Sequence, residues 1–135
     1  GAVGTEFIRI IEQRHPELSR IKLLASRRSA GQRISVNGRQ LVVEETTAAS
    51  FEGVDIACMR VGAEVSRQLA PLAVAAGAVV IDDSSAFRTR EDVPLVVPEI
   101  NGADVEWHQG IISSPNCSTT PLVMVAIPYI GLIPS

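Results

Sequence analysis

Cys117 has the sequence surroundings that most clearly indicate chemistry. It lies in the stretch SSPNCSTTP, residues 113–121, among small polar residues and ahead of an apolar run. The Ser, Thr and Pro residues after it are typical of a helix start, and a helix N-terminus favours the thiolate form of a cysteine. A thiolate beside a nicotinamide could carry an acyl group as a thioester; the alternative is a small, inert core residue. Cys58 has apolar neighbours, so we expect it to be a buried packing residue.

A second polar segment, DDSSAFR at residues 82–88, follows the apolar run at 78–81. A continuous apolar run is typical of a strand buried on both faces, and the carboxyl ends of such strands face the ligand crevice of an α/β sheet. Arg88 could therefore bind an anionic group of a substrate. The alternative is a surface arginine that pairs with a neighbouring Asp or Glu.

Two further segments have the residue types of a dinucleotide site. The sequence GAVG at residues 1–4 could be the second half of a glycine-rich loop that holds a pyrophosphate at a helix N-terminus, or a simple turn. Further along, the segment SRRSAG at residues 26–31 ends an expected strand. NAD-selective sites have an acidic residue there, whereas two guanidiniums and two hydroxyls suit the 2′-phosphate of NADP. A solvated basic loop is the alternative.

Alternating helices and strands must position these segments. The periodicity predicts helices over residues 4–15 and 64–76 and a third after Cys117. Strands are predicted at residues 21–26, 34–36, 41–45, 55–59, 78–81 and 111–112, with a hairpin around Asn37-Gly38. This order predicts an α/β fold, a Rossmann-like parallel sheet with flanking helices. We expect its first strand to be missing, because nothing precedes Gly1.

Composition excludes several other classes of protein. With 135 residues and a net charge of −3, the chain is expected to be one domain or part of one, without nucleic acid binding. Two cysteines make neither a disulfide framework nor a zinc site, and neither His15 nor His108 has the setting of a catalytic base or metal ligand. No apolar run approaches the roughly 18 residues of a membrane span. We therefore expect a cytoplasmic protein, of which this chain is a piece.

Over essentially its whole length the sequence resembles the N-terminal domain of the aspartate-semialdehyde dehydrogenase family. The most specific matches are DVPLVVPE at residues 92–99 and PNCST at residues 115–119. Further blocks match at residues 1–4, 26–31, 44–47 and 51–57. The resemblance implies NADPH-dependent reduction of L-aspartyl 4-phosphate to L-aspartate 4-semialdehyde and phosphate, a step of lysine, methionine and threonine biosynthesis.

The resemblance also implies roles for individual residues. Cys117 matches the nucleophile that carries the acyl group as a thioester, Asn116 supports it, and Arg88 matches the arginine that holds the substrate phosphate. The residues expected to hold NADP are Gly1, Ala2 and Val3 at the pyrophosphate, and Ser26, Arg28 and Ser29 at the 2′-phosphate. No metal is expected.

On this interpretation, residues 1–135 are a partial NAD(P)-binding domain that ends just after the nucleophile helix. We expect the catalytic second domain, with its acid/base histidine, to be absent from this chain, so that the piece alone is inactive. The full-length enzyme is expected to be a homodimer or homotetramer.

The sequence departs from the family pattern at two positions near the expected site. The family commonly has Ser-Ala-Gly where this chain has Arg60-Val61-Gly62, and an asparagine where this chain has Asp83. Two other functions stay open at this point. One is the related N-acetyl-gamma-glutamyl-phosphate reductase, which usually has Gly-Cys-Tyr or Gly-Cys-Phe at its nucleophile. The other is a noncatalytic nucleotide-binding module.

Overall fold

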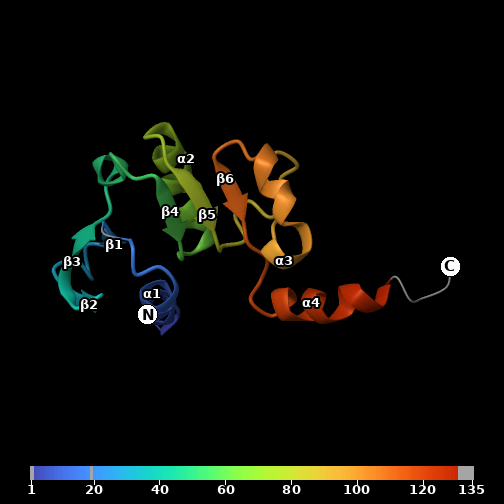
Figure 1. Cartoon of the computed structure of the whole chain (residues 1–135). Helices are drawn as coiled ribbons and strands as arrows, with labels where there is room; N and C mark the ends of the chain where they lie inside the picture. Colours follow the sequence, from blue (N-terminus) through green and yellow to red (C-terminus); the bar gives the residue numbers. More distant parts are fainter. Residues whose placement is uncertain (1, 19, 131–135) are drawn as a thin grey trace. The chain divides into compact units, whose positions relative to one another are not determined.

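The computed structural model describes residues 2–18 and 20–130 (Figure 1). The chain divides into two compact units, residues 1–50 and residues 51–135, and each is described by itself. The predicted α/β fold, with parallel strands and flanking helices, is confirmed. Gly1 lies outside the described residues.

The first unit combines one helix with a small mixed sheet. Helix α1 (Ala2–Arg14) ends before Pro16, as predicted, and is followed by β1 (Leu23–Ala25), β2 (Arg33–Val36) and β3 (Arg39–Glu45). The strand order is β1-β3-β2, with β1 parallel and β2 antiparallel to β3. The hairpin between β2 and β3 is confirmed. Asn37 and Gly38 have φ angles of 50° and 72°, the left-handed values that a tight hairpin turn requires.

The second unit is built around a parallel sheet with the order β4-β5-β6. Its elements are β4 (Ile56–Met59), α2 (Ala63–Ala75), β5 (Val79–Asp82), α3 (Pro98–Asn101), β6 (Ile111–Ser113) and α4 (Thr119–Ile130). The described residues also include two 3-10 helices, η1 (Ala48–Phe51) and η2 (Gly102–Trp107). The sequence patterns did not predict α3, η1 or η2, which are too short for a helical apolar period.

The core of the second unit lies between α2 and one face of its sheet. Ala57 and Met59 of β4 are buried, as are Ala70 and Ala73 of α2. Val80 of β5 is completely buried. This burial alternates along β4 because successive strand residues point to opposite faces.

The same alternation corrects two expectations. Cys58 is exposed, so the prediction of a buried packing cysteine is wrong. Ile56, two residues earlier, is 61% exposed, and Ile81 of β5 is 36% exposed. The segment 78–81 is therefore not buried on both faces by the residues of its own unit. Asp82, expected to follow the strand, is its last residue and is completely buried.

Among the described residues, no helix combines the length and the apolar character needed to cross a membrane.

Candidate active site

The candidate site lies where the three parallel strands of the second unit end. Arg60 follows β4, Asp83 follows β5 and Ser114 follows β6. Main-chain hydrogen bonds hold these ends together. Asp83 N donates to Met59 O at 3.1 Å, and Ser114 N donates to Asp82 O at 2.8 Å. The carboxyl ends of parallel strands form the ligand-binding edge of an α/β sheet, so these residues border the expected crevice.

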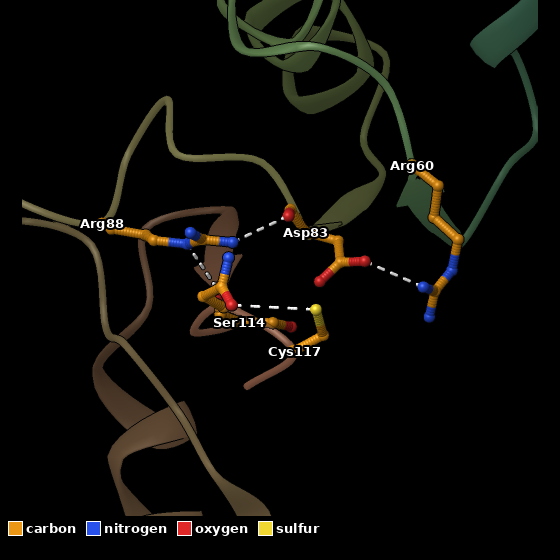
Figure 2. Close-up of polar contacts among 6 residues, drawn as sticks. Arg60, Asp83, Arg88, Ser114 and Cys117 are labelled. Carbon is orange, nitrogen blue, oxygen red and sulfur yellow. Dashed lines mark hydrogen bonds and ion pairs between the residues drawn. The ribbon is translucent and has the colours of Figure 1, made fainter. Parts of the chain in front are cut away.

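Arg88 bridges the ends of β5 and β6. Its Nε donates to the main-chain oxygen of Ser114 at 2.8 Å, and its Nη2 donates to that of Asp83 at 2.9 Å (Figure 2). No carboxylate among the described residues bonds to Arg88, so the alternative of a surface ion pair does not hold. The guanidinium has five N–H groups, and these two bonds use two of them. The half-buried side chain therefore keeps donors available for an anion.

The loop that carries Arg88 is anchored by burial and by hydrogen bonds. Phe87 is only 3% exposed and fixes the chain next to Arg88 in the core. Ser84 Oγ accepts a hydrogen bond from Ala86 N at 3.0 Å, which closes a tight turn at the start of the loop. The position of the Arg88 guanidinium is thus set from both ends, by its loop and by the carbonyls it contacts.

Cys117 lies in the turn between β6 and α4, and its thiol is exposed. Asn116 organises this turn. Its Oδ1 accepts from Ser118 N at 3.0 Å and from Ser118 Oγ at 2.7 Å, and its main-chain oxygen accepts from Thr119 N at 2.8 Å. Cys117 Sγ lies 3.7 Å from the same Oδ1. The helix start predicted after Cys117 is confirmed, and the first N–H groups of α4, those of Thr119 and Thr120, donate to the main-chain oxygen of Asn116.

The two departures noted in the sequence contact each other. Arg60 Nη1 lies 2.8 Å from Asp83 Oδ2, and the two side chains are 35% and 33% exposed (Figure 2). Sequence patterns could not predict this ion pair, because the two residues belong to different strand ends. In the sequence, the opposite charges of the two residues are the feature that could have suggested this ion pair.

Asp82 is a buried acidic residue whose role the sequence did not reveal. Its Oδ1 accepts from Ser66 Oγ at 2.5 Å, and its Oδ2 accepts from Ser84 Oγ at 2.8 Å. These bonds satisfy a carboxylate that is completely removed from solvent. Asp82 therefore connects α2, the end of β5 and the loop that leads to Arg88. The signal that could have found it is the hydroxyl of Ser84, two residues later in the segment DDSS.

Cys58 is exposed but differs electrostatically from a cysteine in water. The surrounding protein removes water from the thiol and raises the pKa of Cys58, while the positive charge of Arg60 opposes this rise. Each histidine contacts a residue close to it in the sequence. His108 Nδ1 accepts from Gly110 N at 2.9 Å, and His15 Nδ1 lies 3.0 Å from Glu17 Oε1.

The residues expected to hold a dinucleotide lie in the first unit. Ser26, Arg28 and Ser29 form a turn directly after β1, in which Ser26 O accepts from Ser29 N at 2.9 Å and from Ala30 N at 3.1 Å. The side chains of Ser26 and Arg28 are exposed, and that of Ser29 is half-buried. Ala2 and Val3 are the first residues of α1, whereas the sequence placed them in a loop before the helix.

The comparisons with known proteins agree on one family. A family model described as the NAD binding domain of semialdehyde dehydrogenase matches residues 1–108. The aspartate-semialdehyde dehydrogenase of Bacillus subtilis (strain 168) is 49% identical over 128 residues, which is 95% of this chain and 37% of that protein. The enzyme of the same name from Synechocystis sp. is 46% identical over 127 residues, again with 37% of its length covered. The chain thus spans little more than a third of these relatives.

Solved structures give the same result. Aspartate semialdehyde dehydrogenase II from Vibrio cholerae, complexed with ASA, superposes with a TM-score of 0.89 and 36% identity over 98% of this chain and 44% of that one. The Candida albicans enzyme with NADP superposes with a TM-score of 0.77 and 28% identity over 97% of this chain and 44% of that one. With the fold, the specific motifs and the family model in agreement, the chain belongs to the semialdehyde dehydrogenase family, and residues 1–108 correspond to its NAD-binding domain.

Proposed function

We propose that the complete protein is an NADP-dependent aspartate-semialdehyde dehydrogenase. It would convert L-aspartyl 4-phosphate and NADPH into L-aspartate 4-semialdehyde, phosphate and NADP⁺, a step of lysine, methionine and threonine biosynthesis. The observation that carries the proposal is the position of Arg88 relative to the nucleophile turn. Its guanidinium is bonded to the carbonyl of Ser114, three residues before the exposed Cys117. The names of the similar proteins from B. subtilis and V. cholerae support the same activity.

The chain's own residues divide the first chemical step between them. Cys117 Sγ attacks the acyl carbon, the bond from that carbon to the phosphate oxygen breaks, and phosphate leaves with the bonding electrons. The N–H groups of Arg88 that are not bonded to carbonyls would hold the phosphate group and stabilise its charge. Asn116 keeps the nucleophile turn in place, which makes it a positioning residue for the thiolate. The product of this step is an acyl-thioester on Cys117.

The residues of the first unit suit NADP. The turn after β1 presents a guanidinium and hydroxyls, from Arg28, Ser26 and Ser29, and this donor set fits a 2′-phosphate better than a bare ribose hydroxyl. Ala2 and Val3 lie in the first turn of α1, where main-chain N–H groups point along the helix axis and suit a pyrophosphate, with Gly1 just before them in the sequence. Bound NADPH would supply the hydride that reduces the thioester carbonyl to the aldehyde, which releases the Cys117 sulfur.

The rest of the proposal concerns the complete protein. We expect a second domain to supply the general acid/base histidine and the groups that bind the substrate carboxylate. Residues 1–135 alone are then expected to be inactive, despite an intact Cys117. We also expect a cytoplasmic homodimer or homotetramer.

Two substitutions in the complete protein test this function. Cys117→Ser should abolish formation of aspartate semialdehyde, since a serine hydroxyl is much harder to ionise than a thiol. Arg88→Lys keeps the positive charge but cannot contact the phosphate through two parallel N–H groups. In the reverse reaction, we expect it to raise the KM for phosphate roughly tenfold or more, with the KM for NADP within about twofold. Turnover by Cys117→Ser, or equal shifts of both KM values in Arg88→Lys, would contradict the proposal.

A further inference from the structure

The ion pair of Arg60 and Asp83 lies directly beside the arginine proposed to hold phosphate. Arg60 comes from the end of β4 and Asp83 from the end of β5, and their charged atoms are 2.8 Å apart. Where the family commonly has neutral residues, this chain has two opposite charges that contact each other. A pair that is about two thirds buried interacts more strongly than a fully exposed one, because less water screens it.

Asp83 is bonded to two arginines through two different groups. Its carboxylate oxygen Oδ2 contacts Arg60, while its main-chain oxygen accepts from Arg88 Nη2 at 2.9 Å. Figure 2 shows both contacts, with the carboxylate turned toward Arg60 and the carbonyl toward Arg88. Arg60 and Arg88 therefore approach the same residue from different sides.

The two acceptor groups of Asp83 differ in strength. A carboxylate binds a guanidinium through charge-assisted, often bidentate bonds that are about twice as strong as bonds to a neutral acceptor. Without a cation of its own, the Asp83 carboxylate would attract the Arg88 guanidinium away from the carbonyls. Such a pair would use the N–H groups of Arg88 that an anionic ligand needs, and the unpaired negative charge would also repel that ligand.

We propose that Arg60 is a positioning residue for Arg88. By occupying the Asp83 carboxylate, Arg60 keeps Arg88 on the carbonyls of Asp83 and Ser114, with its other N–H groups directed to a substrate phosphate. This inference rests on the proposed function of Arg88. It also explains why both departures occur together, since a neutral residue at position 83 would need no partner.

The test is a double-mutant cycle in the complete protein, with the reverse reaction followed at varied phosphate concentration. Arg60→Ser should raise the KM for phosphate roughly three- to fivefold, with the KM for NADP unchanged within about twofold. Arg60→Ser combined with Asp83→Asn should return the KM for phosphate to within about twofold of wild type. Arg60→Gln, which keeps most of the side-chain volume, repeats the measurement if the serine variant folds poorly.

Arg67→Ser is the matched control, because Arg67 pairs with Glu64 at 3.4 Å on the exposed surface of α2 and neither of these two residues is bonded to Asp83 or Arg88. It should leave both KM values unchanged. Arg60→Lys, which keeps the charge, should retain most of the wild-type phosphate affinity.

Two results would overturn the inference. One is an unchanged KM for phosphate in both Arg60→Ser and Arg60→Gln. The other is an increase that Asp83→Asn does not relieve, which would mean that Arg60 acts independently of the carboxylate. Arg88→Lys separates these results from a failure of the proposed function. If that variant also binds phosphate normally, Arg88 is not the phosphate ligand and the function itself must be revised.

Discussion

Ser66 Oγ lies 2.5 Å from Asp82 Oδ1, and both residues are completely buried. The bond joins the first turn of α2 to the last residue of β5. The second carboxylate oxygen, Oδ2, accepts a hydrogen bond from Ser84 Oγ. Ser84 Oγ in turn accepts a hydrogen bond from Ala86 N. Among the described residues, the partners of the Asp82 carboxylate are the hydroxyls of Ser66 and Ser84, and a completely buried carboxylate depends on each of them because it is removed from solvent. The network therefore connects helix packing to the loop that carries Arg88.

Substitution of either hydroxyl should destabilise the complete protein. We expect Ser66→Ala and Ser84→Ala to lower the free energy of unfolding by about 1–3 kcal/mol each, because each leaves a buried carboxylate oxygen without its donor. Ser85→Ala is the control, since Ser85 is exposed, and its effect should stay within about 0.5 kcal/mol. Urea denaturation measures all three. Equal stability of Ser84→Ala and Ser85→Ala would show that the network contributes nothing.

Asn116 should affect Cys117 in two ways, through the structure of the turn and through the charge near Sγ. Asn116→Ala removes the acceptor for Ser118 N and should cost about 0.5–1.5 kcal/mol of stability, the net contribution of a typical hydrogen bond. Asn116→Asp keeps the acceptor and the stability, but places a negative charge near Sγ, which opposes thiolate formation. Alkylation of Cys117 and the rate of turnover should therefore fall in the aspartate variant without a change in the unfolding midpoint. If both variants behave alike, Asn116 has only a structural role.

The two exposed cysteines should differ in their reaction with iodoacetamide. The raised pKa of Cys58 means that less thiolate is present near neutral pH than in a free cysteine, so Cys58 should react more slowly than a reference peptide. Its rate should rise about tenfold per pH unit while the pH stays below its pKa. Arg60→Gln removes the charge that opposes the rise in pKa, and should slow the labelling of Cys58 further.

Mass spectrometry of the labelled protein measures how fast each cysteine reacts. We expect Cys117 to be modified first, with a parallel loss of turnover, and Cys58→Ser to retain full activity. Faster labelling of Cys58 than of the reference peptide at neutral pH would contradict the assigned direction of its pKa shift.

Cofactor choice should depend on the turn after β1. Arg28→Glu replaces a guanidinium with a carboxylate that repels a 2′-phosphate and accepts a hydrogen bond from a ribose hydroxyl. NADP binding should weaken by at least about 1.5–3 kcal/mol, while NAD binding stays equal or improves. Arg14→Glu, the same charge reversal in the last turn of α1, is the control and should leave both affinities unchanged. Equal NADP affinity of Arg28→Glu and wild type would remove Arg28 from the cofactor site.

The sequence determined the local structure well, because short-range rules govern it. The alternation of apolar runs with helical patterns gave the strands and the long helices, and Asn37-Gly38 marked the hairpin because those residues tolerate positive φ. The segment PNCST indicated the helix start after Cys117 from its polar residues alone. Its composition also separated the exposed Cys117 from ordinary core residues.

Burial and partner choice depended on contacts that a sequence pattern does not contain. The apolar neighbours of Cys58 suggested burial, but in a strand they point to the opposite face, and only the packing of α2 decided which face is covered. Arg88 had acidic neighbours in sequence and yet bonds to carbonyls, because the turn places it between two strand ends.

The partners that define the site are far apart along the chain. Arg60 and Asp83 are separated by 23 residues, Ser66 and Asp82 by 16, and Arg88 and Ser114 by 26. Periodicity and turn chemistry act over a few residues, so they specify each element without specifying its neighbours. The parallel pairing of β4, β5 and β6 brings these side chains and carbonyls to one edge. The sequence thus supplied the reactive groups, and the tertiary structure decided which of them bond to each other.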